Sequence, residues 1–359
     1  MKTGGSGNKL SVEIRDLLEA GVVIPAHPLA VDANRKLDER RQRALSRYYL
    51  DAGSGGLAIG VHTTQFEIRN PGIDLYEPVL SLAKEEMDRH VEETGRTVAR
   101  IAGVVGKTEA AVKEAGLAAS LKYDAALLGL AALKEASNKE LIEHCRAVAE
   151  IMPIVGFYMQ TAVGGRVLDL DFWREFAQIE NVVAIKIAPF NRYQTFDVVR
   201  AVAESGRADE IALYTGNDDN ILNDLVSEYR INCNGNVITK RIVGGLLGHW
   251  SVWTRAAVVL LERIKTGVLE VEPVDMLALG NAITDSNAAF FDAANQFYGC
   301  IVGLHEVLRR QAILEGVWTL NEKEVLKPGQ IAEIDRVCAA YPDLNDDQFV
   351  RENLDKWLS

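Results

Sequence analysis

No segment of the chain approaches the ~18 uninterrupted apolar residues that would cross a bilayer, so we expect no membrane-spanning helix. The first ten residues, MKTGGSGNKL, contain no apolar stretch like that of a secretory signal. Basic residues are outnumbered: Lys and Arg total 39 against 51 acidic residues, the net charge is -12, and no basic run would face a phosphate backbone. We therefore expect a cytoplasmic protein that binds neither membranes nor nucleic acids.

Cysteine is also scarce. The four cysteines, Cys145, Cys233, Cys300 and Cys338, lie far apart and have no metal-ligand spacing. We expect them to be small buried hydrophobic side chains in a reducing compartment, and the sequence indicates neither a metal nor a cofactor. With 48% hydrophobic and 25% charged residues, the composition is that of an ordinary globular protein. Its 359 residues suffice for one large barrel or for two ordinary domains.

Short apolar or β-branched runs alternate with longer segments of helical period. Amphipathic segments such as 37–53, 76–93 and 140–151 carry apolar residues at i, i+3 and i+4. The candidate strands are residues 21–26, 56–60, 97–104, 124–130, 153–158, 182–188, 211–216 and 241–247. This alternation predicts a parallel sheet, and eight units predict an α/β fold that closes into a (β/α)8 TIM barrel. The alternative is an open doubly wound sheet.

The helical pattern continues beyond the eighth unit, which ends near residue 267. Residues 280–316 have a helical pattern throughout, so a C-terminal helical extension is expected after the barrel. The predicted parts are an N-terminal segment, 1–20, the barrel, 21–268, and the extension, 269–359. The Gly/Asn-rich stretch CNGNV, residues 233–237, predicts a turn.

Polar residues at the predicted strand ends are the candidates for function, because the active site of such a barrel lies at the C-terminal ends of its strands. They are His27 after the first strand, His62, Thr63, Thr64 and Gln65 after the second, Tyr158 and Gln160 at the fifth, Lys186 in the sixth, Asn217, Asp218 and Asp219 after the seventh, and His249 after the eighth.

Lys186 is the one lysine inside an apolar run, VVAIKIA, residues 182–188. Strand alternation places Ala184 and Lys186 on one face, and the small residues of that face suit a crowded barrel interior. Burial disfavours the ammonium form and leaves an amine that can form a Schiff base with a carbonyl. A structural lysine paired with a carboxylate such as Asp218 is an equal alternative at this point.

Two neighbouring features fit the same chemistry. Tyr158 ends the adjacent strand, where a phenol could carry a proton to or from an imine. The loop that contains Thr63 and Thr64 offers consecutive backbone N–H groups and two hydroxyls, which could hold a carboxylate. A Thr-Thr pair is equally typical of a turn or a helix cap.

Four stretches together resemble the dihydrodipicolinate synthase/N-acetylneuraminate lyase family over roughly residues 20–315. They are TTQ at 63–65, PIVGFYMQ at 153–160, NVVAIKIA at 181–188 and YTGNDDN at 214–220. The resemblance implies a class I, Schiff-base aldolase or dehydratase acting on a 2-oxo acid such as pyruvate, without a cofactor, as a homo-oligomer (dimer or tetramer). It also implies that Lys186 forms the imine, that Tyr158 is the general acid/base, that Thr63 relays a proton, and that Thr64 and its loop hold the carboxylate.

The sequence departs from the family pattern near the expected substrate. His62 and Gln65 replace the glycines of the usual GTTGE, and His27 replaces a small polar residue. The tyrosine motif that commonly follows the fourth strand is replaced by LGLAALKEAS, residues 128–137. An arginine that fixes a substrate carboxylate in some members has Arg166 as its candidate here. We expect these departures to reflect an altered substrate, contacted also by Gln160, Asn217 and His249.

Two other functions remain open. The histidines at the strand ends and the acids Asp218 and Asp219 could assemble a divalent metal site, as in a class II aldolase. Against this, no two candidate ligands share an element at ligand spacing. The second alternative is a non-catalytic barrel with a binding role, since a fold alone does not imply an activity.

Overall fold

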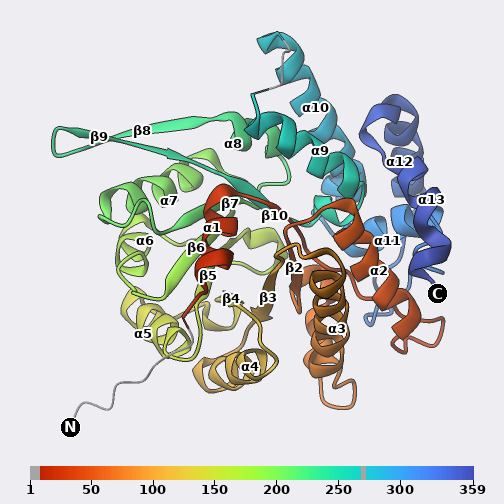
Figure 1. Ribbon diagram of the computed structural model, residues 1–359, viewed down its shortest axis with the longest axis horizontal. Coiled ribbons are helices and arrows are strands. Elements are labelled where there is room, and N and C mark those ends of the chain that lie inside the picture. The colour runs from red at the N-terminus through yellow and green to blue at the C-terminus, as the bar shows by residue number, and fades with distance from the viewer. Residues whose placement is uncertain (1–8, 268–271) are drawn as a thin grey trace. The chain divides into compact units, whose positions relative to one another are not determined.

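The structure is a computed structural model that describes residues 9–267 and 272–359 (Figure 1). The predicted boundary between barrel and extension, 268/269, and the first eight residues of the predicted N-terminal segment lie outside the described residues. Residue contacts divide the chain into two compact units. Unit 1 comprises Met1–Gly21, Ala99–Asn217 and Asp224–Gly245, and unit 2 comprises Val22–Val98, Asp218–Asn223 and Leu246–Ser359. The three-part division made from the sequence stays a prediction.

Eight strands form one sheet in the order β1-β10-β7-β6-β5-β4-β3-β2. Their bounds are β1 Val23–Pro25, β2 Gly56–Ile59, β3 Ala99–Val104, β4 Ala125–Leu128, β5 Ile154–Met159, β6 Val182–Ala188, β7 Ala212–Thr215 and β10 Gly244–Leu247. The pairs from β3 to β7 and the β7–β10 pair are parallel. A parallel bridge between Ala26 and Ala58 joins the two ends of the order, so the sheet closes on itself. The (β/α)8 TIM barrel is confirmed, and the open doubly wound sheet is wrong.

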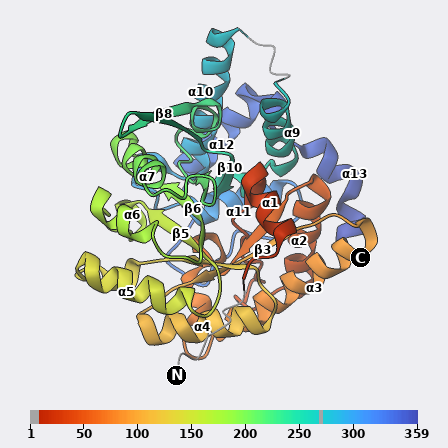
Figure 2. The same ribbon diagram turned by 60° about the vertical axis from the view of Figure 1, so that its left-hand side comes forward.

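Apart from α1, which precedes β1, the helices of unit 1 each follow one of its strands in the chain. They are α1 Val12–Ala20, α4 Thr108–Ser120, α5 Asn138–Ala149, α6 Leu170–Phe176 and α7 Arg192–Glu204. Figure 2 shows α4, α5, α6 and α7 in succession beside the strands. Capping side chains fix several starts: Ser137 accepts from the amide of Glu140, and Asp169 and Asn191 accept from amides of the first turns of α6 and α7. These caps fix the starts of α5, α6 and α7 in the loops that follow β4, β5 and β6.

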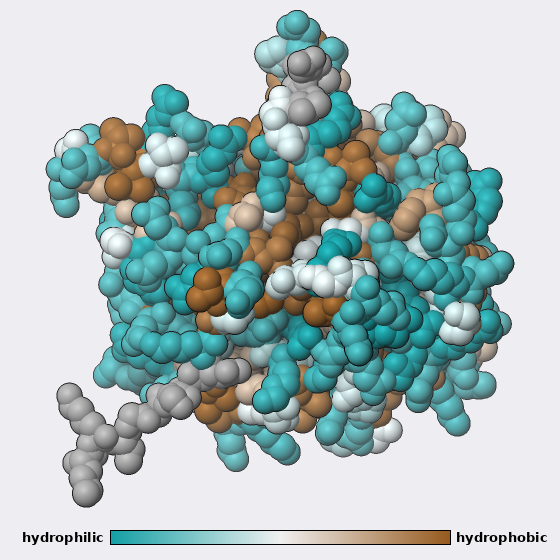
Figure 3. Space-filling view, in the orientation of Figure 1, coloured by the Kyte–Doolittle hydropathy of each residue, from teal (hydrophilic) through white to brown (hydrophobic). Residues whose placement is uncertain are grey.

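An antiparallel hairpin, β8 Glu228–Cys233 and β9 Asn236–Arg241, follows the short helix α8 Ile221–Val226. The turn expected at 233–237 is confirmed, with φ of 53° at Asn234 and 89° at Gly235. The hairpin itself was not predicted, and the strand expected at 241–247 begins only at Gly244. Figure 1 shows the ribbon running out past α7, and Figure 3 shows hydrophobic residues toward its end, where Val237 is 61% exposed. Most residues of β8 and β9 are polar or exposed, so the hydrophobicity pattern of the sequence does not predict them as strands.

Unit 2 contains most of the remaining helices. They are α2 Glu39–Ala52, α3 Tyr76–Thr94, α9 Thr254–Lys265, α10 Pro273–Phe290, α11 Cys300–Arg310, α12 Pro328–Ala340 and α13 Asp347–Trp357. A continuous helical pattern over 280–316 is wrong, because α10 and α11 are separated by a loop. In this loop Asp292, Gln296 and Phe297 adopt left-handed φ values of 53°, 56° and 65°, which a right-handed helix does not contain.

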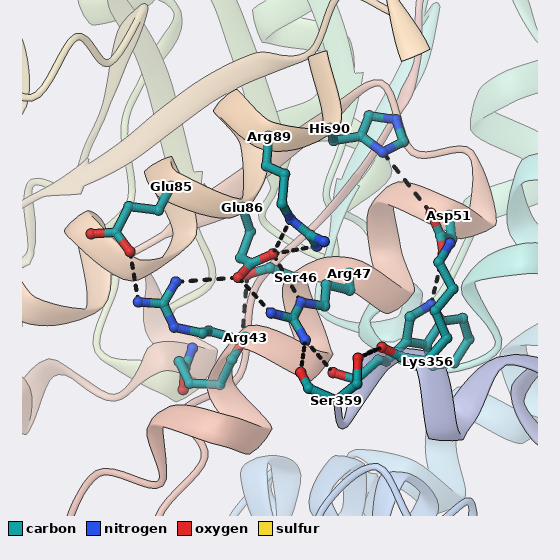
Figure 4. Close-up of polar contacts among 12 residues, drawn as sticks. Arg43, Ser46, Arg47, Asp51, Glu85, Glu86, Arg89, His90, Lys356 and Ser359 are labelled. Atoms are coloured by element: carbon teal, nitrogen blue, oxygen red, sulfur yellow. Dashed lines mark hydrogen bonds and ion pairs between the residues drawn. The ribbon is translucent and has the colours of Figure 1, made fainter. Parts of the chain in front are cut away.

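A cluster of arginines on one glutamate holds α2, α3 and α13 together within unit 2 (Figure 4). Glu86 of α3 is 3% exposed and accepts hydrogen bonds from Arg43, Arg47 and Arg89. Burial alone would raise the pKa of Glu86, but the hydrogen bonds and charges of these arginines lower it. Arg47 also donates to the backbone oxygen of Trp357. The second residue that ties α13 is Asp51, which accepts from the Trp357 indole at 2.8 Å.

The cysteine prediction holds for two residues of the four. Cys145 and Cys300 are buried, whereas Cys233 and Cys338 are partly exposed, and none of the four forms a disulfide. Cys233 lies on the exposed hairpin, which explains its accessibility. None of the described helices is both long enough and apolar enough to span a bilayer.

Candidate active site

The two faces of β5 are distinguished by Gly156. A Cβ at Gly156 would lie 2.7 Å from the Phe176 ring of α6, so this side of the strand packs directly on the helix. Because side chains alternate along a strand, Tyr158 shares the helix side and Phe157 points the opposite way. The register pairs Phe157 with Lys186 of β6, so these two side chains share a face. In a barrel of this kind, the face away from the helices is the interior.

Lys186 lies on that interior face, as expected, and is 7% exposed. Its Nζ lies 4.4 Å from the centroid of the Phe157 ring, a cation–π distance. Directly after β7, a Cβ on Gly216 would lie 2.7 Å from Lys186 Cε and 2.8 Å from Ala188 Cβ. The glycine therefore leaves the space through which the lysine side chain runs.

Tyr158 does not share this face, and the acid/base role expected of it stays a prediction. Its hydroxyl accepts a hydrogen bond from the amide of Leu168 at 3.2 Å, and its ring packs on Trp173 of α6 at 5.3 Å. The side chain is 1% exposed, and burial raises the pKa of the phenol. Tyr158 is thus a packing residue between β5 and α6, on the opposite side of the strand from the Lys186 amine.

Thr63 and Thr64 lie in a 3₁₀ turn, His62–Thr64, directly after β2. The Thr63 hydroxyl donates to the carbonyl of Ala26 at 2.7 Å, and the Thr64 hydroxyl donates to that of His27 at 2.7 Å. Thr64 Oγ1 also accepts from the amides of Gly60 and Val61, which is the capping arrangement considered as the alternative. Thr64 therefore supports the backbone of unit 2. The proton-relay role of Thr63 stays a prediction.

Gln65 has a backbone conformation that glycine adopts more readily than other residues. Its φ is 68°, in the left-handed region that favours glycine. Its Oε1 accepts from the amide of Leu320 at 2.6 Å, so the side chain holds the segment between α11 and α12. The His62 ring packs beside that of Phe66 at 6.0 Å. Substrate contacts by His62 and Gln65 stay predictions.

His27 and His249 pack within unit 2, and the substrate contacts expected of them stay predictions. His27 Nε2 lies 2.9 Å from Ser46 Oγ of α2, and its Nδ1 lies 2.7 Å from the Pro28 carbonyl. The His249 ring stacks on Phe290 of α10 at 5.5 Å. Burial lowers the pKa of each imidazole to about 4, so both are neutral near pH 7.

Arg166 and Asn217, also expected to bind substrate, hold backbone and side chains within unit 1. The Arg166 guanidinium donates to the carbonyls of Leu133 at 2.6 Å and Ala136 at 2.9 Å, which fixes the loop after β4. Asn217 is fully buried: its Oδ1 accepts from the amide of Phe190, and its Nδ2 donates to Asp224 at 3.0 Å. Substrate binding by Arg166 and Asn217 stays a prediction.

Gln160, the remaining candidate of this unit, is partly exposed at the start of the turn Thr161–Val163. Its backbone oxygen accepts from the amide of Gly165, where a Cβ would lie 2.0 Å from the Met159 carbonyl. The turn therefore needs glycine at 165. Substrate binding by Gln160 stays a prediction.

The described residues provide no cluster of three His, Cys, Asp or Glu side chains that could hold a metal ion. A cleft of about 520 Å³ lies in unit 2, lined by α9, α10 and residues 343–352 and including Trp250 and Trp253. His249 borders this cleft, but the cleft is not lined by any residue of β5 or β6. The metal-dependent alternative thus gains no support from these side chains.

Two residues of the site, Phe157 and Gly216, were missed in the sequence. The sequence shows only that Phe157 and Tyr158 lie on opposite faces of the strand. The packing of Gly156 on α6 identifies the face of Phe157 as the interior one. Gly216 lies two positions after Tyr214, which is in register with Lys186. A glycine at this place predicts a close approach by another group.

The chain is similar to proteins of known family and structure. Residues 20–230 match the family model described as the dihydrodipicolinate synthetase family. No curated protein matches the chain. At the identities found with solved structures, similarity establishes the fold alone.

Three solved structures illustrate this similarity. The prophage protein YagE of E. coli K12, in complex with pyruvate, is 16% identical with a TM-score of 0.69, covering 90% of this chain and 97% of that one. Dihydrodipicolinate synthase from Oceanobacillus iheyensis is 16% identical with a TM-score of 0.71, covering 92% and 98%. N-acetylneuraminate lyase from Fusobacterium nucleatum, complexed with pyruvate, is 15% identical with a TM-score of 0.67, covering 90% and 98%.

Proposed function

The chain belongs to the dihydrodipicolinate synthetase family, and on this premise we propose that it is a class I lyase that forms an imine between Lys186 and a 2-oxo acid such as pyruvate. The observation that carries the proposal is the position of Lys186, which is 7% exposed on the interior face of β6. Two similar structures, YagE and the Fusobacterium lyase, were solved with pyruvate. A 2-oxo acid offers both the carbonyl for an amine and a carboxylate for orientation.

The proposed reaction uses the amine as a nucleophile. The lysine amine adds to the substrate carbonyl, and loss of water gives a protonated imine. The imine nitrogen then accepts an electron pair from a neighbouring bond, so that cleavage of a C–C bond, or loss of a proton from the carbon next to the imine, leaves an enamine. In a dehydration this enamine expels a hydroxyl as water and becomes a conjugated imine. Aldol cleavage and dehydration are both served by this intermediate. The family resemblance makes Thr63 the proposed proton relay; its hydroxyl donates to the Ala26 carbonyl at 2.7 Å and must leave that bond to pass its proton on.

A second candidate, a barrel retained for binding a ligand, is favoured by one observation. The residue of β5 that shares a face with Lys186 is Phe157, whose side chain has no ionisable group. A site that only binds a ligand does not need an acid or base there.

Reductive trapping tests the proposal and separates the two candidates. The protein is incubated with pyruvate and borohydride, and intact and peptide mass spectrometry locate any reduced pyruvyl group. We expect one adduct per chain, on Lys186, that forms only when substrate and reductant are both present. A panel of 2-oxo acids and aldehydes that gives no adduct, while pyruvate still shields Lys186 from acylation, would support binding without catalysis. An adduct on a different lysine would contradict the assignment.

We also propose that the protein is a cytoplasmic homo-oligomer, a dimer or a tetramer, as the family resemblance implies. Light scattering coupled to size-exclusion chromatography checks this, because the chain mass is 39.4 kDa. A molar mass that stays at that of one chain over a wide concentration range would contradict it.

A further inference from the structure

The side chain of Gln330, in α12, lies against the loop between α10 and α11, residues 291–299. A Cβ on Gly299 would lie 2.3 Å from Gln330 Oε1. The Nε2 of Gln330 donates to the backbone oxygens of Gly299 at 2.9 Å and Phe290 at 3.2 Å. A reversed amide would place its oxygen against these two carbonyls, so the hydrogen bonds decide which end of the amide is the oxygen. The donor end is used, and the Oε1 end faces away from these carbonyls.

Two buried oxygens meet beside Gly299. Among the described residues, neither Gln330 Oε1 nor Asp292 Oδ2 has a hydrogen-bond partner. The same Cβ that would lie 2.3 Å from Gln330 Oε1 would lie 2.8 Å from Asp292 Oδ2, so both atoms point to one place. Gln330 is 3% exposed and Asp292 is 5% exposed, so bulk solvent does not pair with them. Two buried acceptors that converge in this way need a third group between them.

Asp292 brings a negative charge to this pair of oxygens. Its other oxygen, Oδ1, accepts a hydrogen bond from Asn295 Nδ2 at 2.6 Å. No lysine, arginine or histidine of the described residues forms an ion pair with Asp292. A buried carboxylate without a counter-charge costs far more free energy than a paired one. The third group should therefore carry a positive charge.

We propose that Asp292 Oδ2 and Gln330 Oε1 bind a monovalent metal cation, Na⁺ or K⁺, that joins the loop 291–299 to α12. Carboxylate and amide oxygens are the ligands that hard cations prefer. One carboxylate balances one positive charge, whereas a divalent ion would leave a net charge buried. The site contains one carboxylate and neither imidazole nor thiolate, so it is not of the kind that holds a transition metal. It is independent of the function proposed for Lys186.

Thermal unfolding of the full chain in matched salts tests the inference. The unfolding temperature, followed by circular dichroism, is measured at constant ionic strength while KCl or NaCl replaces choline chloride, whose cation is too large to lie between two oxygens. An ion that binds the folded chain alone should raise this temperature by about 2 °C for each tenfold increase above its dissociation constant. Equal unfolding temperatures in the three salts would show that a proton or a water molecule serves the two oxygens, and would overturn the inference.

The variant Asp292→Asn locates the site. Asparagine removes the charge and suits the left-handed φ of 53° at this position. We expect the response to K⁺ and Na⁺ to be lost. In choline chloride this variant should unfold at the same temperature as the wild type or higher, because its uncompensated charge is gone. An unchanged response to both ions would overturn the assignment.

The matched control is Asp285→Asn, also in unit 2. The carboxylate of Asp285 in α10 pairs with Arg336 at 2.8 Å, so it already has a counter-charge. This variant should keep the full response to K⁺ and Na⁺. Loss of the response in both variants would show that it follows the overall charge of the chain rather than a bound ion, and would count against the site.

Should Asp292→Asn fail to fold, Gln330→Glu decides the matter. This variant places a second carboxylate beside Asp292, and sites with several carboxylates favour Ca²⁺. We expect calcium chloride to raise its unfolding temperature clearly more than that of the wild type, and K⁺ and Na⁺ to stabilise it less than calcium does. If calcium affects the variant and the wild type equally, the two oxygens do not share an ion and the inference fails.

Discussion

Replacing Lys186 by alanine is expected to abolish imine formation and to lower turnover at least about 1,000-fold, because removal of a covalent nucleophile leaves only binding and orientation. The fold should survive, since the side chain that is removed is directed to the barrel interior rather than into the packing between strands and helices. Borohydride trapping with pyruvate measures the first effect. Thermal unfolding followed by circular dichroism measures the second.

Two further variants serve as controls for this result. Lys186→Arg keeps a positive charge at the site but has no amine that condenses with a carbonyl, so we expect it to match the alanine variant. Gly216→Ala keeps the amine but adds a Cβ at 2.7 Å from Lys186 Cε, which must displace the lysine. Trapping in that variant should slow by about 10-fold, as misplacement of a reacting group costs rate without removing it. Persistent trapping of pyruvate in Lys186→Ala would disprove the role of this residue.

Stability is expected to fall steeply as the pH is lowered from about 6.5 to about 4. His27, His249 and His305 are buried, and burial lowers the pKa of each to about 4. In the unfolded chain each has its ordinary pKa, near 6.5. Between these values the unfolded chain binds protons that the folded chain does not, so the free energy of unfolding decreases as the pH falls. Above about pH 6.5 neither state is protonated, and the full stability is present.

The size of this effect follows from the shift. One pKa unit corresponds to about 1.4 kcal/mol, so each histidine costs up to about 3 kcal/mol once the pH reaches 4. Urea unfolding at a series of pH values measures it. Glutamine cannot be protonated, so His249→Gln should reduce by one the number of protons taken up on unfolding. The free energy of unfolding should then depend less steeply on pH. Glu86 affects stability at lower pH than the histidines do. Its pKa is depressed in the folded chain, so the stability that it contributes is lost only as the pH falls below the ordinary carboxyl pKa. A free energy of unfolding that is constant from pH 7 to 4.5 would contradict the prediction.

Much of the barrel could be predicted because its strands and helices differ in period. The helical patterns of residues 37–53 and 76–93 predict α2 and α3, and the apolar run at 182–188 predicts β6. The side of Lys186 could also be predicted, since alternation within one strand requires only that strand. Closure of the barrel, by contrast, depends on the pairing of β1 with β2, which lies outside any local pattern.

The side to which each candidate residue points is the part that the sequence shows least well. Tyr158 is expected at the site from its position at a strand end, but a shift of one residue along a strand moves a side chain to the opposite face. Its neighbour Phe157 is in register with Lys186. The His27 ring is directed to Ser46 of α2. Arg166 donates to carbonyls 33 and 30 residues earlier in the chain, and no sequence spacing shows such partners.

The bond between Gln65 and the amide of Leu320 makes two distant stretches of the chain dependent on each other. The glutamine occupies a left-handed conformation, which costs free energy in any residue other than glycine and asparagine, and its side chain offsets that cost by serving a backbone donor 255 positions away. A glycine at position 65 would relax the turn and deprive that donor of its acceptor. Substitutions in the two stretches should therefore be compatible only as pairs, so that exchange of either one between homologous proteins carries a penalty that the joint exchange avoids.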